Sequence, residues 1–288
     1  MNPATFAYLT GIVKTRSGGI IGADQGYMLE TRLAPLLKRE ALRDLDALAA
    51  RLKAPRGETL AQEMTELLTT NESSFFRDTR PFEHLRGLLP ELHKARAPGQ
   101  PLRIWSAACS TGQEAYSIAI ILAELGEADP GFRARRVEII GTDITAAVLE
   151  RARAGVFTQF EVQRGMPIRT LMKRFVQEDT RWRIRPEIAT PCRFEKFNLL
   201  GDPRSMGRFD VVFCRNVLIY FDVPTKARVL GGIAQILAPD GALYLGAAET
   251  AMGVTQALLP KPNERGVYGV AGQPARGAAV AEPARLRA

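Results

Sequence analysis

The feature that most constrains the fold of this chain is the regular alternation of short apolar runs and helical stretches after Pro101. Parallel strands need a crossover connection between them, and that connection is usually a helix. The alternation therefore predicts a mostly parallel sheet with helices on both faces. The expected strands are Leu102–Ala108, Val137–Gly141, Phe209–Cys214 and Ala242–Gly246, the last after a turn at Pro239-Asp240-Gly241. The expected helices are Gln113–Leu125, Thr145–Ala154 with Thr145 as its cap, and Pro224–Leu237.

The first hundred residues show helical spacing without intervening strands. Leu29, Leu33, Leu36 and Leu37 recur at intervals that place them together on a helix. Pro35 is expected to kink or interrupt that helix. Further helices are expected to open at Thr59, where Thr59-Leu60-Ala61-Gln62 has the capping-box pattern, and after Asp78, with Pro81 in the first turn.

Two stretches interrupt the alternation, Arg181–Arg185 and Cys192–Phe197. Both show period-two patterning, which is typical of antiparallel strands, and they predict a small β insertion at about residues 165–197. We expect a helical N-terminal domain at 1–90 and a larger α/β domain at 91–271. Residues 272–288 are rich in Ala, Pro, Gly and Arg and are expected to form a disordered tail.

The composition favours a cytoplasmic protein with reduced thiols. The sequence has no run of roughly eighteen apolar residues, so no membrane insertion is expected, and its N-terminus lacks the pattern of a signal peptide. Its three cysteines form no CxxC pair. With only two histidines, a metal site is not expected.

The net charge of +8 is compatible with nucleic acid, an anionic membrane surface or an acidic protein as partner, and charge alone does not choose among them. The basic residues Arg32, Lys38, Arg39 and Arg43 could steer an acidic protein partner. An ordinary solvated surface explains them equally well.

Small and polar residues follow several of the expected strands. In an open parallel sheet, ligands bind beyond the carboxyl ends of the strands, near the point where the strand order reverses. The run Cys109-Ser110-Thr111-Gly112 after the first strand would let the backbone approach a cofactor closely. Asp143, at the end of the second strand, can accept hydrogen bonds from ribose hydroxyls. Asn198 and Asn216 follow two later strands. Each residue alone is also explained by a turn or a helix cap, but together they predict one site.

The GxGxxG fingerprint of dinucleotide-binding proteins is absent, which argues against a nicotinamide cofactor. A cofactor without a pyrophosphate has less need of that glycine-rich cradle. S-adenosylmethionine is such a cofactor, and its nucleoside would still require an acid at Asp143.

Four segments carry a more specific pattern: Asn71–Arg77, Trp105–Ser117, Gly141–Ile144 and Phe209–Phe221. Together they resemble the chemotaxis receptor methyltransferases, the CheR-type protein-glutamate O-methyltransferases. The resemblance runs from near the N-terminus to about Val270. It implies an α/β, Rossmann-like S-adenosylmethionine-dependent methyltransferase domain with an all-helical N-terminal domain and a small antiparallel β insertion.

The resemblance also implies a function. The expected enzyme esterifies glutamate side chains on methyl-accepting chemotaxis receptors, with S-adenosylmethionine as methyl donor and S-adenosylhomocysteine as product. The implied partners are the cytoplasmic domains of those receptors, without nucleic acid, and the protein is expected to be a cytoplasmic monomer. The cofactor contacts implied by the resemblance are Asn71, Ser73, Arg77, Glu114, Asp143, Asn198, Leu199, Arg215 and Asn216. The implied catalytic residues are Arg77 and Tyr220, with Tyr220 near the transferred methyl group.

The chain departs from the family pattern at three places. The family usually has Thr at the position of Ser73, which keeps the hydroxyl. It usually has Glu-Glu-Pro where this chain has Gln113-Glu114-Ala115, which keeps the second acid. Its usual Gly-His-Ser-Glu ending is here Gly246-Ala247-Ala248-Glu249, a change expected to alter local packing or the substrate side.

Other functions stay open at this point. A methyltransferase acting on another protein or on nucleic acid would suit the positive charge. Base-amine methylation typically uses an Asp/Asn-Pro-Pro-Tyr/Phe signature, and this chain has Cys214-Arg215-Asn216-Val217 there and no Pro-Pro pair. A non-catalytic module that senses S-adenosylmethionine is the third reading, which the intact Arg77, Glu114, Asp143 and Tyr220 disfavour.

Overall fold

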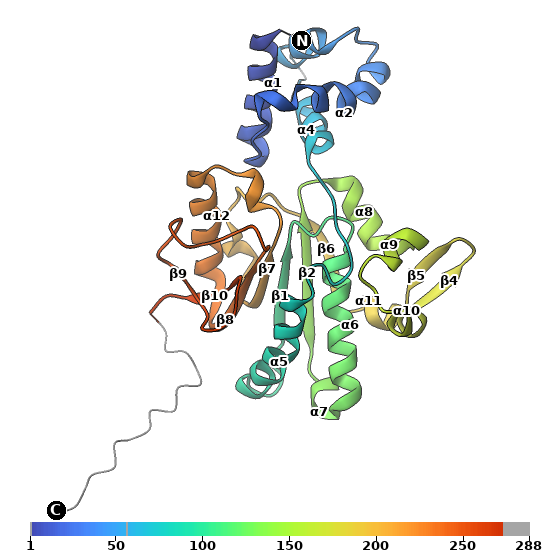
Figure 1. The fold of residues 1–288 in the computed structure, drawn as a ribbon, viewed down its shortest axis with the longest axis vertical. Helices are drawn as coiled ribbons and strands as arrows, with labels where there is room; N and C mark the ends of the chain where they lie inside the picture. The colour runs from blue at the N-terminus through green and yellow to red at the C-terminus, as the bar shows by residue number, and fades with distance from the viewer. Residues whose placement is uncertain (1, 56, 273–288) are drawn as a thin grey trace, which may run out of the picture.

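The computed structural model describes residues 2–55 and 57–272 of the chain (Figure 1). The expected disordered tail lies, after Gly272, outside the described residues. Among the described helices, none combines the length and hydropathy that a membrane-crossing segment needs.

The centre of the molecule is a seven-stranded sheet with the strand order β6-β2-β1-β7-β8-β10-β9. Its strands are β1 (Leu102–Ala107), β2 (Val137–Asp143), β6 (Cys192–Lys196), β7 (Phe209–Cys214), β8 (Leu237–Leu245), β9 (Leu258–Pro260) and β10 (Val267–Val270). Strand β1 pairs in parallel with β2 on one side and with β7 on the other, so the strand order reverses beside β1. The antiparallel pairings of this sheet are those of β10 with β8 and with β9. The predicted Rossmann-like α/β fold class is confirmed.

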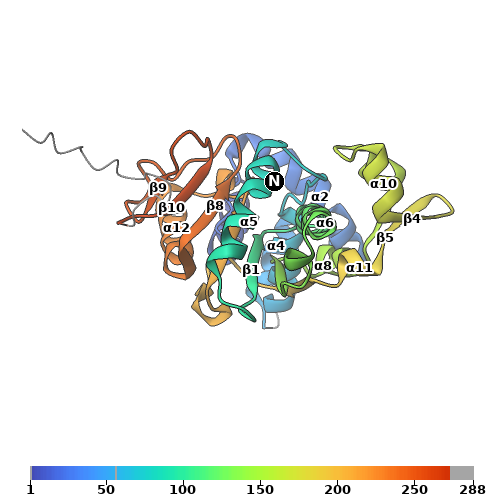
Figure 2. The ribbon, with the colours of Figure 1, turned by 90° about the horizontal axis from the view of Figure 1, so that it is seen from below.

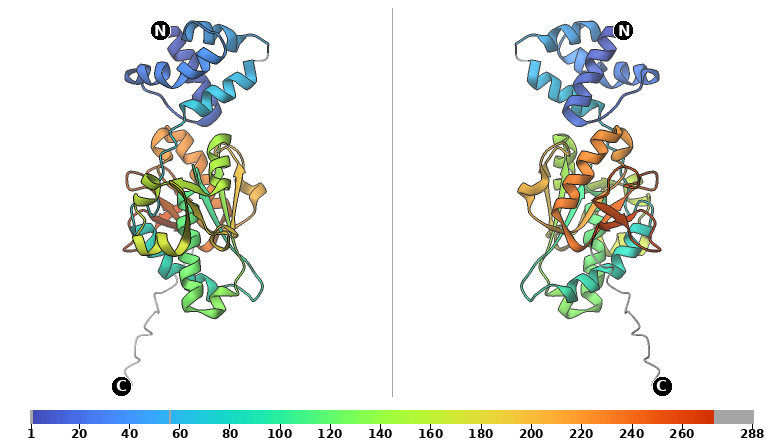
Figure 3. Two further views of the ribbon diagram at one scale, coloured as in Figure 1. Left: turned by 90° about the vertical axis from the view of Figure 1, so that its right-hand side faces the viewer. Right: turned by 90° about the vertical axis from the view of Figure 1, so that its left-hand side faces the viewer.

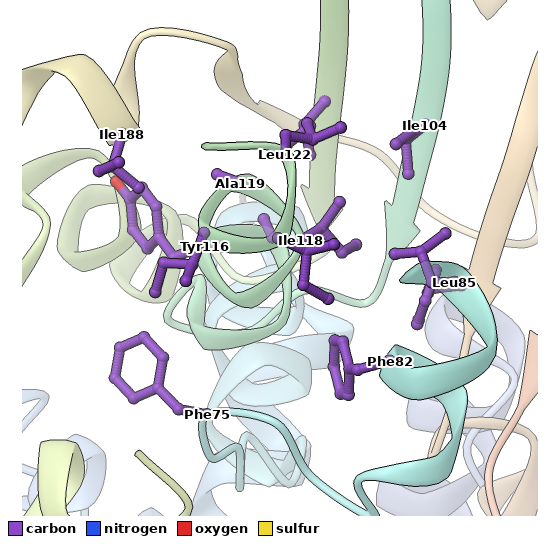
Figure 4. Packing of buried hydrophobic residues seen from close by; sticks show 14 of the residues in the cluster. Phe75, Phe82, Leu85, Ile104, Tyr116, Ile118, Ala119, Leu122 and Ile188 are labelled. Carbon is purple, nitrogen blue, oxygen red and sulfur yellow. The ribbon is translucent and has the colours of Figure 1, made fainter. Parts of the chain in front are cut away.

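The sheet is buried on both faces because its strands alternate their side chains between two apolar cores. In β1, Ile104 belongs to the core that contains α5 and α6, whereas Trp105 belongs to the core that contains α12. Figure 4 shows Ile118 and Leu122 of α6 gathered with Ile104 and with Phe82 of α5. The helices around the sheet are α5 (Arg80–Ala95), α6 (Gln113–Ala128), α7 (Pro130–Arg133), α8 (Ala146–Ala154), α11 (Pro186–Ala189) and α12 (Val223–Ile236), with the 3₁₀ helices η2 (Pro203–Met206) and η3 (Leu218–Tyr220).

The N-terminal helices form a bundle with a core of its own. They are α1 (Pro3–Ser17), the 3₁₀ helix η1 (Ala23–Gln25), α2 (Gly26–Arg39), α3 (Leu45–Lys53) and α4 (Gly57–Leu68). Their buried residues, from Leu9 to Leu68, make one apolar cluster. The bundle lies at one end of the molecule, beyond the sheet (Figures 1 and 3). Helix α5, expected within the helical domain, instead packs against the sheet through residues such as Phe82 and Leu85.

The predicted antiparallel insertion is present, but its strands differ from the expectation. A three-stranded antiparallel sheet has the order β3-β5-β4 and projects to one side of the molecule (Figure 2). Its strands are β3 (Val156–Thr158), β4 (Phe175–Glu178) and β5 (Arg181–Ile184), with α9 (Gln159–Gln163) and α10 (Ile168–Arg174) between them. The second expected strand, Cys192–Phe197, is not part of this sheet. It forms β6, which pairs in parallel with β2 at the edge of the main sheet. Period-two patterning fits an exposed edge strand as well as an antiparallel hairpin, and Phe194 is the only buried residue of β6.

One predicted helix start is wrong, and one predicted cap has the right position but makes no capping hydrogen bond. Helix α4 begins at Gly57, so Thr59 lies inside the helix and does not cap it. Gly57 lies against the backbone of Leu52, where a Cβ atom would be 2.2 Å from the carbonyl oxygen, so a glycine is needed at the start of this helix. Thr145 occupies the cap position of α8, but its side chain makes no capping hydrogen bond. The N–H of Ala146 donates instead to Glu66 of α4, at 3.1 Å.

Two proline-containing segments also differ from the expectation. Pro35 lies inside the continuous helix α2 and does not interrupt it. Residues Pro239 to Gly241, expected as a turn before the last parallel strand, lie within β8. The pairing of β7 with β8 shifts register between Phe209 and Val211, which accommodates the extra residues as a bulge.

Candidate active site

A cavity of about 530 Å³ lies at the carboxyl ends of β1, β2, β6 and β7, on the side that the N-terminal bundle covers. This volume is typical of small-molecule sites, about 300–1,000 Å³. The cavity lies beside β1, where the strand order reverses. All ten residues predicted for the site line it: Asn71, Ser73, Arg77, Glu114, Asp143, Asn198, Leu199, Arg215, Asn216 and Tyr220.

The loop after β1 connects the end of β2 with the segment that begins at Asn71, and both border the cavity. Ala108 and Ser110 both have positive φ angles, +57° and +51°, which non-glycine residues rarely adopt. This backbone directs the N–H of Ser110 to Asp143 Oδ2, at 2.9 Å. The Ser110 hydroxyl donates to the carbonyl of Asn71, at 2.7 Å. The loop therefore holds the segment that begins at Asn71 against the end of the sheet.

Asp143 is the last residue of β2, and only 4% of its surface is exposed. Burial raises its pKa above the usual value, although hydrogen bonds from the backbone of Thr145 and Ser110 act in the opposite direction. Its Oδ1 accepts from the Thr145 N–H at 3.0 Å, so both oxygens are fixed by the main chain. Each oxygen keeps a second lone pair, with which it can accept from the hydroxyl groups of a ligand.

Arg215 and Glu114 form a buried ion pair at the centre of the site. Glu114, in the first turn of α6, accepts from the Ser106 hydroxyl at 2.7 Å and from Arg215 Nη1 at 2.9 Å. Arg215 Nη2 donates to Asp78 and to the carbonyl of Arg77, both at 2.7 Å. The Arg215 side chain is 1% exposed. The guanidinium thus ties β7 to α6 and to the 71–77 segment.

Asn198 follows β6 and links the cavity to the N-terminal bundle. Its amide Nδ2 donates to the carbonyl of Arg16 in α1. Its Oδ1 accepts from the Leu200 N–H at 3.0 Å. Half of the hydrogen-bonding capacity of this side chain, one donor and one lone pair, is therefore used within the protein, and Leu199 beside it also lines the cavity.

Asn216 and Tyr220 lie at the two ends of the turn after β7. Asn216 has a φ angle of +58°, and Tyr220 is 37% exposed. The Tyr220 carbonyl accepts from the N–H of Ile20 at 2.8 Å, and Gly19 forms an antiparallel bridge with Phe221. Arg77 also lines the cavity and is partly exposed, and its Nη1 donates to the Glu72 carbonyl at 3.2 Å.

The sequence did not identify two further contributors to the site. Residues of the N-terminal bundle and of the segment after α1, including Val13, Ser17, Ile20 and Met28, form one wall of the cavity. These residues do not follow a predicted strand, which was the pattern used to find the site in the sequence. Glu249 accepts hydrogen bonds from the turn that carries Asn216. This residue was noted as the last of the ending Gly246-Ala247-Ala248-Glu249, but its contact with the turn could not be seen in the sequence.

The donors and acceptors of this cavity fit S-adenosylmethionine. The ribose hydroxyls need an acceptor such as Asp143, and the ammonium group needs one such as Glu114. The carboxylate needs a cation, and Arg77 is partly exposed at the cavity wall.

Comparison with known proteins agrees with this chemistry. The family model described as "CheR methyltransferase, SAM binding domain" matches residues 71–265. The chain is 38% identical over 248 residues to chemotaxis protein methyltransferase 1 of Pseudomonas aeruginosa, covering 85% of this chain and 90% of that protein. It is 38% identical over 240 residues to chemotaxis protein methyltransferase Cher2 of Pseudomonas putida, covering 82% and 86%. The chemotaxis protein methyltransferase of Vibrio parahaemolyticus is 38% identical over 247 residues, covering 84% and 88%.

Proposed function

The chain belongs to the CheR methyltransferase family, and from this premise we propose that it methylates glutamate side chains on methyl-accepting chemotaxis receptors. The observation that carries the proposal is the joint presence, in one cavity, of two carboxylates, an arginine and a partly exposed tyrosine: Asp143, Glu114, Arg77 and Tyr220. The relatives named above are chemotaxis protein methyltransferases, which supports a role in chemotaxis.

Each cofactor contact is a proposal about a particular side chain. Asp143 accepts from the ribose hydroxyls through its remaining lone pairs. Glu114 accepts from the amino group of the cofactor, and Arg77 donates to its carboxylate. The remaining proposed contacts are Asn71, Ser73, Asn198, Leu199, Arg215 and Asn216. Since Arg215 donates from Nη1 to Glu114 and from Nη2 to Asp78, we propose that it acts mainly by holding Glu114 in place.

S-adenosylmethionine supplies a methyl group on a positively charged sulfur. The receptor glutamate, with an ordinary pKa near 4.3, is already an anion at neutral pH, so no general base is needed. Tyr220 donates a hydrogen bond that orients this carboxylate. Because opposite charges are neutralised during transfer, strong stabilisation of both ions would slow the reaction. The protein therefore contributes mainly alignment and exclusion of water, and alignment can supply about 7–11 kcal/mol.

The proposal also assigns domains within the chain. We assign the bundle of α1 to α4 (residues 3–68) to a helical domain that faces the substrate, the part from α5 to β10 to the methyltransferase domain, and the sheet β3-β5-β4 (residues 156–184) to the β insertion. We further propose a cytoplasmic monomer that acts on the cytoplasmic domains of receptors and not on nucleic acid.

The test is methyl transfer from radiolabelled S-adenosylmethionine to receptor-containing membranes, with duplex DNA as the parallel substrate. We expect base-labile label, typical of a methyl ester, on receptors alone. Label on DNA would overturn the proposal. Calorimetric binding of S-adenosylhomocysteine without transfer to any receptor would favour a sensing module instead.

A further inference from the structure

The carboxylate of Glu249 lies behind the turn that carries Asn216 and Tyr220, outside the cavity wall. It accepts five main-chain hydrogen bonds: Oε1 from Val217 (2.9 Å), Leu218 (2.7 Å) and Ile219 (3.3 Å), and Oε2 from Asn216 (2.8 Å) and Gly246 (2.6 Å). A carboxylate offers about four lone-pair sites, so these donors saturate it. Among the described residues it forms no ion pair.

The turn needs an acceptor of this kind. Residues 216–219 direct four successive N–H groups to one side, as at the start of a helix, and such a row of donors binds anions. The 3₁₀ helix η3 has no side-chain cap of its own. Asn216 has a φ angle of +58°, which Asn tolerates better than most residues, and its N–H donates to Glu249 in this conformation.

The end of β8 approaches the turn too closely for any side chain. A Cβ atom at Gly246 would lie 2.7 Å from Glu249 Oε2 and 2.8 Å from Asn216 Nδ2. The backbone at Gly246 is therefore in close contact with both Glu249 and Asn216. Because the carboxylate of Glu249 binds the N–H groups of residues 216–219, a shift of this carboxylate would also shift the backbone that precedes Tyr220.

We propose that Glu249 is a positioning residue for methyl transfer, which fixes the 216–219 turn and thereby sets the place of Tyr220 at the cavity. This inference rests on the proposed function. Its action is indirect, because Tyr220 follows the last of the four N–H groups and Glu249 itself borders none of the cavity.

The kinetic test is the substitution Glu249→Gln, alone and combined with Tyr220→Phe. An amide has one acceptor oxygen, and its NH₂ group would face N–H donors, so the turn loses part of its support. We expect kcat on receptor membranes to fall about 10- to 100-fold, with the KM for the receptor nearly unchanged. A displacement of the Tyr220 side chain by about 1 Å can reduce the rate by this much. In the Tyr220→Phe background the same change should cost less than about 3-fold. Equal losses in both backgrounds would overturn the inference.

Two further variants separate positioning from general damage. Glu249→Asp keeps the charge and should recover part of the lost kcat. Glu161→Gln removes a carboxylate that also accepts a backbone N–H, from Thr158 at 2.8 Å, but in the β insertion, and should leave kcat unchanged. If Glu249→Gln does not fold, the comparison is made with Glu249→Asp.

Amide hydrogen exchange gives a readout that needs no activity. Exchange at residues 216–219 should be at least about 10-fold faster in Glu249→Gln, with α12 unaffected. Unchanged exchange in the turn would overturn the positioning role. A wild-type protein with a protected turn but no methyl transfer would refute the proposed function alone.

Discussion

Asp143 keeps only part of its hydrogen-bonding capacity for a ligand, because the N–H groups of Ser110 and Thr145 already occupy one site on each oxygen. The same is true of Asn198, whose amide binds the Arg16 carbonyl, and of Arg215, whose guanidinium binds two carboxylates. At the scale of residues, the site is thus held rigid by the protein before any ligand arrives, which favours tight and specific binding.

Asp143→Asn tests this arrangement. The amide NH₂ would face a backbone N–H donor, and the remaining oxygen would lose its charge. A hydrogen bond to a charged group contributes about 1.5–3 kcal/mol, so calorimetry should show S-adenosylhomocysteine binding weakened about 10- to 100-fold. Asp44→Asn is the matched control, since Asp44 accepts from the Ala47 N–H in α3, far from the cavity. Unchanged affinity in Asp143→Asn would remove Asp143 from the ligand site.

Arg77→Ala should lower kcat/KM for methyl transfer about 10- to 100-fold, because Arg77 is the partly exposed cation proposed for the carboxylate of the cofactor. Arg80→Ala, an exposed arginine at the start of α5, should leave the rate unchanged. Steady-state kinetics on receptor membranes distinguishes the two. Full activity of Arg77→Ala would exclude Arg77 from the mechanism.

At the residue scale, the side chains that line the cavity could be predicted from the sequence. The hydrogen-bond partners of each side chain could not. All ten predicted residues line it, because strand ends and family motifs mark positions along the chain. Hydrogen-bond partners from distant segments leave no such mark. The basic residues illustrate this: Arg32 binds the carbonyls of Leu68 and Thr69, and Arg39 pairs with Glu63, so both already have partners within the bundle.

At the scale of elements, Glu66 joins the bundle to the sheet domain. It lies in α4, accepts from the first N–H of α8 at 3.1 Å and pairs with Lys196 of β6 at 2.7 Å. Burial acts to raise the pKa of Glu66, but hydrogen bonds from Lys196, Gln62 and Ala146 outweigh it, so the pKa lies below its usual value. The ionised form is therefore the one that stabilises the folded protein.

Glu66→Gln should lower the free energy of unfolding at pH 7 by about 1 kcal/mol, the usual effect of losing a helix cap. A lowered folded-state pKa gives stability that is complete above the unfolded value of about 4.5 and is lost as pH falls through the folded value. The difference between wild type and variant should therefore shrink below about pH 4.5, as measured by urea unfolding. Glu63→Gln, one turn earlier on α4, should cost less than about 0.5 kcal/mol. A pH-independent difference would contradict this account.

The elements that the sequence predicted well are those with two buried faces. β1 and β7 are short, mostly apolar stretches whose residues are nearly all buried. The prediction failed for β6, because an edge strand with one buried side chain has the same alternation as a hairpin strand. At the start of α8 it placed Thr145 correctly at the cap position but missed the accepting side chain, which comes from α4, about eighty residues earlier. Both errors concern partners that only the folded chain brings together.

At the scale of the whole molecule, the cavity is completed by contact between the bundle and the sheet domain. Lys14 pairs with Asp222 at 2.9 Å, and the Gly19–Phe221 bridge closes the same side. S-adenosylhomocysteine should therefore protect the segment of residues 18–21 as well as the loop of residues 108–112 from hydrogen exchange, each several-fold. Strand β4 of the insertion should be unaffected. Protection of the 108–112 loop alone would show that the ligand does not reach the bundle.

The contact between Asn198 and the Arg16 carbonyl spans 182 residues of chain. At a synthesis rate of about 5–20 residues per second, the ribosome needs about 10–40 s to add that stretch. During this time the residues of the bundle core, from Leu9 to Leu68, are already synthesised. Ile20 and Met28 then lack the strand ends of the sheet domain, with which they line the cavity in the complete chain. The cavity can therefore close only after Phe221 has been synthesised, because the bridge between Gly19 and Phe221 is part of its closed side.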